Sequence, residues 1–417
     1  MPLTADNCPD PQLMAILRKE LRRQRFKLEM IASENFVSEA VLRIGASVFT
    51  NKYSEGYPGN RYYGGCENAD ELESLCQARV RKIFGCEHVN VQPHCGSSAN
   101  MAAFFSVLQP GDAILGMSLA HGGHLTHGAP VSFSGRLFKT EFYGVREDTE
   151  LIDYDELAAK AEAGRPKMII AGGSAYPRVI DFDKFREVAD RAKAFLMVDM
   201  AHFAGLVAAG LFPSPIPKAD IVTTTTHKTL RGPRGGLILC RKSLAKLIDD
   251  QIFPGVQGGP LMHVVAAKAA ALGEALEPEF IDYQRQVVKN AQRLAVNLID
   301  AGFRLVSGGT DTHLILVDLR SKNLTGACAE KALDQAGITA NKNAVPFDRQ
   351  NYAITSGLRL GTAALTTRGF KEEDMDKVAE FIVEALRHHG EDGRLNKIRQ
   401  RVEEFTQAFP LYPNLEF

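Results

Sequence analysis

Short apolar runs alternate with longer amphipathic segments from about residue 70 to residue 240. The runs are rich in β-branched residues and read VNVQP, AILGM, KMIIAGG, AFLMVDMAH and IVTTTT. Buried strands of this length, separated by helix-length segments, are typical of βαβ units. The pattern therefore predicts an α/β fold with a mostly parallel, doubly wound sheet.

The segments on either side of this region follow other patterns. Residues 12–30 are charged and predict a helix, and residues 277–303 have the periodicity of a long amphipathic helix. The next stretch, FRLVSGGTDTHLILVDL, is rich in strand-forming residues. We therefore expect a helical N-terminal arm over residues 1–40, a large domain over residues 41–279 and a smaller α+β domain over residues 280–417.

Residues 50–65, TNKYSEGYPGNRYYGG, interrupt these patterns. The stretch holds four tyrosines among glycines and asparagines, a poor composition for a helix or a strand. Loops that carry aromatic and ionisable side chains are more often binding sites than simple connections. We therefore expect this loop to take part in a site.

Composition narrows the choice of partners and compartment. The length of 417 residues agrees with two domains, and 49 Lys and Arg residues nearly balance 50 Asp and Glu residues. This balance favours neither nucleic acid nor an anionic membrane as a partner, and we find no signal peptide and no run of membrane-spanning length. The seven cysteines stand singly, which argues against disulfides or structural zinc and favours the cytoplasm.

A candidate phosphate site lies in HCGSSANMAAFF. Gly96, Ser97 and Ser98 stand where a strand leads into a helix, and the free N–H groups of a helix start can bind phosphate. A plain serine N-cap is the alternative. The lysine of a P-loop is missing, so the stretch is not a nucleotide-binding loop of that kind.

A candidate acid, Asp199, ends the predicted strand of FLMVDMAH, three residues before His202. In parallel sheets, a carboxylate at the C-terminal end of a central strand points into the ligand crevice. A buried carboxylate needs a cationic partner, for which a protonated ring nitrogen would serve. The alternative is a cap for the next helix.

The stretch LAHGGHLTHG places His121, His124 and His127 at a spacing of three, which is also found in metal sites. Glycines interrupt the helix that would align them, and no carboxylate lies between them, so we expect no metal. One of these rings could stack on a planar ligand. A plain loop histidine is the other possibility.

Lys228 follows four threonines in TTTTHKTLRGPRGG and could be a nucleophile, a phosphate ligand or a solvated residue. At the end of a buried strand its amine would lose hydration, which lowers the pKa and favours a nucleophile. Pyridoxal phosphate requires a phosphate site, an acid for its ring nitrogen, a residue that stacks on the ring and a lysine amine. The sequence offers a candidate for each of these groups. A nicotinamide is disfavoured because no GxGxxG follows an early strand.

Arg359 in TSGLRLGT stands between glycines in the predicted small domain. A guanidinium binds a carboxylate through two parallel hydrogen bonds, so Arg359 is a candidate for the carboxylate of an amino-acid substrate. An ion pair with a neighbouring Asp or Glu is the alternative.

These motifs, with IASENF, PGVQGGPLMH and VDMAHFAGLVAAG, resemble those of serine hydroxymethyltransferases along nearly the whole chain. The resemblance implies the pyridoxal-phosphate-dependent fold type I of the aspartate aminotransferases, with a mostly parallel sheet of the seven-stranded type in the large domain. It implies reversible interconversion of L-serine and glycine, with tetrahydrofolate as cosubstrate and 5,10-methylenetetrahydrofolate as product. It also implies a cytoplasmic homodimer, or a larger homo-oligomer, with shared active sites.

The resemblance also implies site residues. Lys228 would form a Schiff base with pyridoxal 5′-phosphate beside His227, while Glu55 and Tyr53 would act from the partner subunit. The implied cofactor contacts are Gly96, Ser97, His124, Ser174, Asp199, His202 and Lys228, with Gly258 and Gly259 across the dimer. The implied substrate contacts are Ser33, Arg359 and, across the dimer, Tyr63. The implied folate contacts are Leu119, Gly123, His124, Leu125 and Asn343.

Some positions depart from the family pattern, although none removes a catalytic group. They are Cys95, Ser98, Pro177, Ala363, residues 351–353 and residues 43–47. They bear on substrate preference and folate affinity, so two other activities stay open: an α-methylserine hydroxymethyltransferase and a folate-independent β-hydroxy amino acid aldolase. A third possibility is a non-catalytic protein of the same fold.

Overall fold

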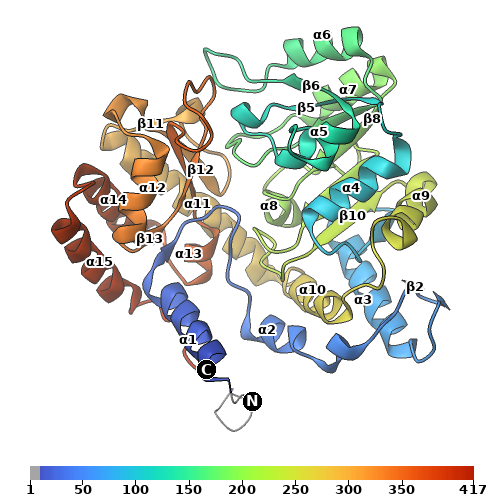
Figure 1. The fold of residues 1–417 in the computed structure, drawn as a ribbon, viewed down its shortest axis with the longest axis horizontal. Coiled ribbons are helices and arrows are strands. Elements are labelled where there is room, and N and C mark those ends of the chain that lie inside the picture. Colours follow the sequence, from blue (N-terminus) through green and yellow to red (C-terminus); the bar gives the residue numbers. More distant parts are fainter. Residues whose placement is uncertain (1–9) are drawn as a thin grey trace.

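The computed structural model describes residues 10–417 and contains a larger and a smaller body, which lie side by side in Figure 1. The larger body is built on a seven-stranded sheet in the order β4-β10-β9-β8-β7-β5-β6. Its strands are β4 (His88–Asn90), β5 (Ala113–Met117), β6 (Lys139–Tyr143), β7 (Met168–Ala171), β8 (Phe195–Asp199), β9 (Ile221–Thr225) and β10 (Gly236–Cys240). Strands β5 to β9 are parallel, and β10 runs antiparallel to both neighbours. The predicted α/β fold with a mostly parallel sheet is confirmed.

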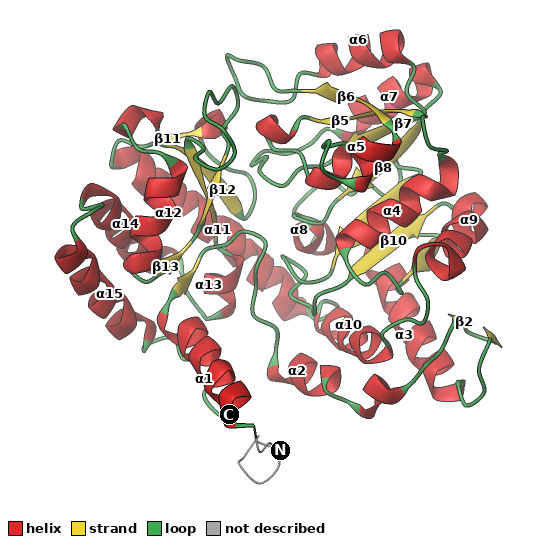
Figure 2. Ribbon diagram, viewed as in Figure 1, coloured by secondary structure: helices red, strands yellow, loops and turns green. Residues whose placement is uncertain are grey.

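Helices cover both faces of this sheet (Figure 2). They are α2 (Glu39–Gly45), α3 (Glu67–Phe84), α4 (Gly96–Val107), α5 (Phe133–Leu137), α6 (Tyr154–Gly164), α7 (Phe182–Ala192), α8 (Ala204–Ala208), α9 (Ala245–Asp250) and α10 (Met262–Glu274). The alternation of side chains along β8 shows the two layers: Leu196 and Val198 join the core that contains Phe185 of α7, while Met197 joins the core that contains Phe104 of α4. Each face of the strand is therefore buried, which explains its continuous apolar sequence.

Two strands of the seven-stranded sheet were not predicted. Strand β6 is an edge strand whose Lys139 and Glu141 are exposed, so its sequence lacks the apolar run of a central strand. Strand β10 follows the glycine-rich turn after Lys228, and its run GLILC is too short to be distinguished from that turn by periodicity.

The smaller body has a four-stranded antiparallel sheet in the order β11-β12-β15-β14. Its strands are β11 (Arg304–Leu305), β12 (Leu314–Asp318), β14 (Asn341–Asn343) and β15 (Gly357–Gly361), and its helices are α12 (Gly326–Gln335), α13 (Ala363–Thr367), α14 (Glu372–Arg387) and α15 (Asp392–Thr406). The predicted long amphipathic helix is α11 (Pro278–Asp300), which runs between the two bodies in Figure 1.

The N-terminal segment is partly a strand. Helix α1 (Pro11–Phe26) ends four residues before the predicted end at residue 30, because Leu28–Glu29 forms β1, which pairs in parallel with β13 (Ile338–Thr339). Leu28 and Met30 are fully buried in the core of the smaller body. The first nine residues of the predicted arm lie outside the described residues, and the domain limits stay a prediction.

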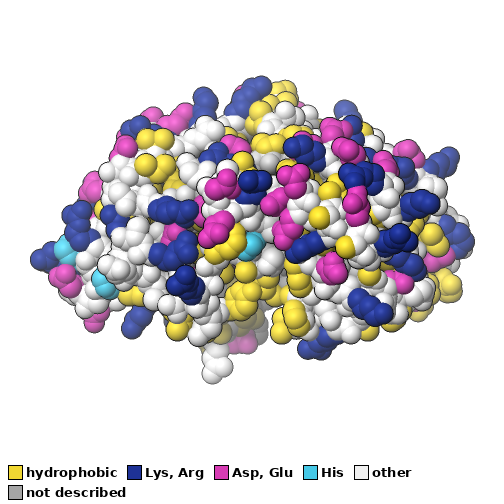
Figure 3. Space-filling view, turned by 90° about the horizontal axis from the view of Figure 1, so that it is seen from above, with side chains coloured by type: hydrophobic (Ala, Val, Ile, Leu, Met, Phe, Trp, Pro, Cys, Tyr) yellow, Lys and Arg dark blue, Asp and Glu magenta, His cyan; other side chains and the backbone are white. Residues whose placement is uncertain are grey.

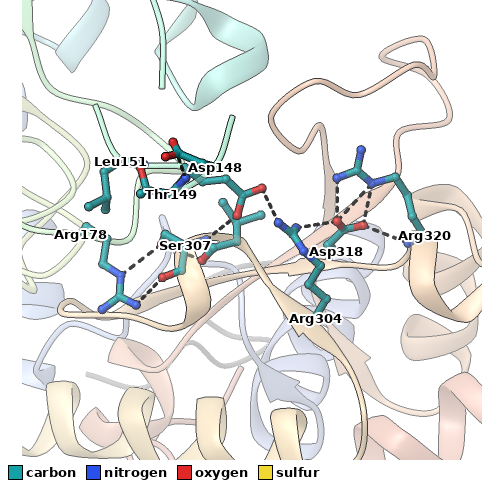
Figure 4. A network of polar contacts seen from close by, with 10 residues as sticks. Asp148, Thr149, Leu151, Arg178, Arg304, Ser307, Asp318 and Arg320 are labelled. Atoms are coloured by element: carbon teal, nitrogen blue, oxygen red, sulfur yellow. Dashed lines mark hydrogen bonds and ion pairs between the residues drawn. The ribbon is translucent and has the colours of Figure 1, made fainter. Parts of the chain in front are cut away.

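A polar network joins the two bodies away from the sheet ends (Figure 4). Glu150 accepts a hydrogen bond from the backbone N–H of Ser307 at 2.7 Å and pairs with Arg304 at 2.8 Å. Arg304 also pairs with Asp318 at 2.7 Å, and Arg320 holds the same carboxylate at 2.7 Å. Glu150 and Ser307 both have a φ of 55°, an uncommon conformation that is retained where surrounding contacts stabilise it.

Charges of both signs are interspersed over the face of the molecule in Figure 3. Among the helices of residues 10–417, none combines the length and the apolar character that crossing a bilayer requires.

Asp318→Asn should lower the free energy of unfolding at pH 7 by about 2 kcal/mol, because charge-assisted hydrogen bonds to a buried carboxylate are lost. Burial opposes ionisation of Asp318, but the hydrogen bonds and charges of Arg320 and Arg304 lower its pKa. The carboxylate therefore stabilises the fold above about pH 4, and this contribution is lost as the pH falls through the lower pKa of the folded protein.

Urea unfolding across pH checks this prediction. The difference between wild type and Asp318→Asn should narrow below about pH 4. Asp282→Asn, which breaks an exposed pair with Arg285, is the matched control and should change stability by less than about 0.5 kcal/mol. A pH-independent difference would contradict the role of the Asp318 carboxylate.

Candidate active site

A cavity of about 300 Å³ opens at the carboxyl ends of the parallel strands, where ligands bind in open α/β sheets. Residues that follow β7, β8 and β9 line it together with the start of α4, and β15 contributes Arg359 from the smaller body. The predicted site residues that line this cavity are Ser33, Gly96, Ser97, His124, Ser174, Asp199, His202, His227, Lys228 and Arg359. Residues far apart in the sequence thus meet at one place.

The start of α4 forms a close-fitting cradle. A Cβ atom on Gly96 would lie 2.7 Å from Cγ2 of Thr225, so a larger residue would not fit here. The N-cap residue is Cys95 rather than a serine, and Ser98 Oγ accepts a hydrogen bond from the Cys95 N–H at 3.1 Å. Among the described residues, Ser97 makes no hydrogen bond through its side chain, so its hydroxyl and the first N–H groups of α4 are available to an anion.

Asp199 is held as an anion by donors from three parts of the chain. Its carboxylate accepts hydrogen bonds from Asn100 Nδ2 at 2.9 Å, His127 Nε2 at 3.1 Å and the N–H of Ala201 at 3.0 Å. Burial opposes ionisation, but the hydrogen bond and charge of His127 hold the pKa of Asp199 well below its ordinary value. Helix α8 begins only at Ala204, so Asp199 does not cap it.

The threonine run before Lys228 helps to orient a donor to Asp199. Thr223 of β9 donates to Oδ1 of Asn100 at 2.6 Å, which turns the amide N–H groups of Asn100 toward Asp199 and Thr126. Asn100 was not predicted as a site residue. The signal for it was an amide side chain four positions after Gly96, on the same face of the helix and directly before the apolar run MAAFF.

The three histidines of LAHGGHLTHG have different surroundings. His124 lines the cavity, and burial together with the charge of His127 lowers its pKa to about 4, so its ring is neutral. His121 lies apart and packs against Phe347 of the smaller body, with ring centroids 4.8 Å apart. Potential ligand atoms of His124, His127 and Asp199 lie within 4.8 Å of one another, but His127 and Asp199 are already hydrogen-bonded to each other.

Lys228 is buried, with 8% of its surface exposed, which rules out the solvated alternative. Burial lowers the pKa of its amine to about 8, while the negative charge of Asp199 raises it and the nearby Arg359 and Arg234 lower it further. A substantial fraction of the amine is therefore neutral and nucleophilic slightly above neutral pH.

His227 offers a buried N–H group beside Lys228. Arg234 donates to His227 Nε2 at 2.6 Å, and burial and the charge of Arg234 lower the pKa of His227 to about 3. The ring is therefore neutral with its proton on Nδ1, and this nitrogen has no partner among residues 10–417. Arg234 also lines the cavity.

Arg359 is a partly buried cation without an acidic partner. Its Nη1 donates to the carbonyl of Ser174 at 2.7 Å and its Nε donates to Asn341 Oδ1 at 3.2 Å. Within residues 10–417 no carboxylate lies at ion-pair distance, so the alternative of an ion pair with Asp or Glu is wrong. Burial lowers the pKa of Arg359 only to about 10, so it stays charged and suits an anionic ligand.

A second group of predicted residues lies together outside the cavity lining. Tyr53 and Tyr63 are about half exposed, and their rings are 5.2 Å apart. The hydroxyl of Tyr53 lies 3.2 Å from Glu55 Oε1. Added Cβ atoms on Gly258 and Gly259 would meet Glu55 and Tyr53 respectively. The five residues therefore form one exposed cluster.

The predicted folate residues other than His124 do not line the cavity either. Leu119 and Leu125 belong to short helical turns on both sides of Gly123, whose Cβ would lie 2.1 Å from the carbonyl oxygen of Met117. Asn343 lies on β14 of the smaller body, and its role stays a prediction.

The residues of the cavity fit pyridoxal phosphate on the observations above. The glycine cradle at α4 suits a phosphate, ionised Asp199 suits a protonated ring nitrogen, and the amine of Lys228 is poised for an aldehyde. The unpartnered N–H of His227 offers a further donor.

A comparison with protein families agrees with this arrangement. A family model described as serine hydroxymethyltransferase matches residues 7–382, which is most of the chain.

Acetylation of the cofactor-free full-length chain with acetic anhydride should modify Lys228 with a pH midpoint near 8, because burial lowers the pKa of its amine. Exposed Lys246 is the internal control, because it reports the reactivity of a solvated amine under the same conditions. Asp199→Asn should move the Lys228 midpoint below 8, because a negative charge that favours the ammonium form is removed. Mass spectrometry resolves the two sites, and a Lys228 midpoint above 10 would contradict the assignment.

Proposed function

The chain belongs to the serine hydroxymethyltransferase family, and on that premise we propose that it interconverts L-serine and glycine. Tetrahydrofolate would accept the one-carbon unit, and pyridoxal 5′-phosphate would bind at Lys228. The observation that carries the proposal is the single cavity that gathers Lys228, Asp199 and Arg359. It combines a nucleophilic amine, an anion and a cation, all at least partly buried, at the sheet end that binds ligands in this fold.

The cofactor would be held by residues that are already oriented. The start of α4, with Gly96 and Ser97, would take the phosphate, and Asp199 would pair with the ring nitrogen. His124, neutral and at the cavity wall, would lie against the ring. Pyridoxal phosphate, when bound, supplies an electron sink that stabilises negative charge at the α-carbon of the substrate.

The substrate would be oriented by Arg359, whose guanidinium would bind the α-carboxylate with Ser33 nearby. Fixing the carboxylate sets the direction of the bond to be broken relative to the cofactor ring. Lys228, with a pKa of about 8, can give up and take back a proton at Nζ near neutral pH. Burial of the cavity limits competition from water.

The exposed cluster around Tyr53 and Glu55 supports a dimer. These residues and Tyr63 lie outside the cavity of their own chain, as expected if they complete the cavity of a partner copy. We propose that Glu55 handles a proton during hydroxymethyl transfer and that Gly258 and Gly259 contact the partner's phosphate. A partly exposed carboxylate and two half-exposed tyrosines are then explained as parts of a shared site.

Purified protein should cleave L-serine faster than α-methylserine, and tetrahydrofolate should accelerate the reaction. Lys228→Ala should reduce serine cleavage by at least roughly a thousandfold, because the buried amine is lost. Glycine from L-serine, alanine from α-methylserine and formaldehyde equivalents from both are measured side by side, with and without the folate. Faster turnover of α-methylserine, or a rate independent of the folate, would favour the two alternative activities.

An equal mixture of Lys228→Ala and Glu55→Gln chains, refolded or co-expressed, should recover about a quarter of wild-type activity. Half of the dimers are then mixed, and each mixed dimer has one site with both Lys228 and Glu55 intact. Each variant alone serves as the control. No recovery, in dimers shown to contain both chains, would mean that Glu55 acts within its own chain.

A further inference from the structure

His313, directly before β12, is a fully buried histidine to which the reaction proposed above assigns no role. It lies in TDTHLILVDL of the smaller body, and its ring lies nearly parallel to that of His202 in the larger body, with centroids 5.5 Å apart and an angle of 24° between the planes. His202 lines the cavity and is itself buried. The pair therefore connects the cavity wall to the smaller body.

The contacts of the pair limit where its protons lie. His313 Nε2 is 3.3 Å from His202 Nδ1 and 3.1 Å from the carbonyl oxygen of Ala32. A carbonyl oxygen can only accept, so the Ala32 contact requires the proton of His313 to be on Nε2. His313 Nε2 then also donates toward His202 Nδ1, which must be the bare, accepting nitrogen.

The remaining nitrogens agree with this assignment. His313 Nδ1 has no partner among the described residues. An unpaired lone pair at that buried position costs less than an unpaired N–H would, so the proton on Nε2 is the favoured arrangement. Burial lowers the pKa of His313 to about 3 and, with the charges of Lys228 and Arg359, lowers the pKa of His202 well below its ordinary value. Both rings are therefore neutral, so the tautomer determines which nitrogen of His202 can donate a hydrogen bond.

We propose that His313 is a positioning residue that holds His202 in the tautomer with its proton on Nε2. His202 then presents an N–H donor, rather than a lone pair, to the cavity. A donor at this wall suits an anionic oxygen of a bound ligand, such as a phenolate or a carboxylate, and disfavours a protonated amine.

The backbone around His313 keeps the contact in place. The carbonyl of His313 accepts a hydrogen bond from the N–H of Thr362 at 3.0 Å, and the N–H of Gly361 donates to Met30 at 2.8 Å. These bonds tie β12, the end of β15 and the segment that leads to Ala32 and Ser33. The orientation of His202 is thus set from the same elements that carry Arg359 and Ser33. Only the identity of the ligand in this inference rests on the function proposed above.

Nitrogen-15 NMR of the full-length chain labelled at histidine tests the proposal, with and without pyridoxal phosphate. Wild type should show His202, assigned by His202→Gln, with a protonated Nε2 and a bare Nδ1. His313→Phe should give His202 shifts of a tautomer mixture, because the donor is lost. His313→Gln should retain the wild-type tautomer, because the glutamine amide places N–H groups near the position of the histidine Nε2.

Cofactor affinity gives a second readout. An absorbance titration with pyridoxal phosphate should show roughly tenfold weaker binding for His313→Phe, in line with one lost hydrogen bond to a charged group, and near-wild-type binding for His313→Gln. His88→Gln, which alters a contact with Asp249, is the matched control and should change neither readout.

A protonated Nδ1 on His202 in wild type, or an unchanged His202 tautomer in folded His313→Phe, would overturn the proposal. The wild-type spectrum decides the point even if His313→Phe does not fold. A wild-type chain that has the expected tautomer but binds no pyridoxal phosphate would refute the proposed function and leave the role of His313 intact.

Discussion

A carboxylate buried at the end of a central strand is the constraint on which the site depends. Asp199 can remain ionised there only because donors converge on it from α4, from the loop that carries His127 and from the turn at Ala201. Thr223 then orients Asn100, so the β-branched run before Lys228 serves the acid on the neighbouring strand. A change in any of these elements would leave a buried charge without its partners.

The positive groups of the cavity follow from the same constraint. Lys228, Arg234 and Arg359 line the cavity, and among the residues that line it only Asp199 opposes them with a negative charge. Such a cavity is short of negative charge, which a phosphate and a substrate carboxylate would supply. The neutral histidines around it, among them His124 and His227, add directional hydrogen bonds without adding charge.

The smaller body contributes side chains to the site as well as covering it. Its β15 carries Arg359, His313 directly precedes its β12, and the polar network of Glu150, Arg304 and Asp318 fixes it to the larger body. Sequence reasoning predicted Arg359 because a lone arginine between glycines is conspicuous. It missed Asn341, Asn100 and His313, because each acts on another side chain rather than on a ligand. Partners that come from other strands leave no local pattern.

The sequence by itself determined the fold class, the long helix α11 and the identity of the reactive groups, because apolar periodicity and short motifs are local properties of the chain. Only the tertiary structure decided that α1 gives way to a strand at Leu28, that Asp199 is ionised, and that Arg359 lacks an acidic partner. It also placed Tyr53 and Glu55 away from their own cavity. Ionisation, tautomer and completeness of a site depend on distances between segments that are remote along the chain, and folding alone sets those distances.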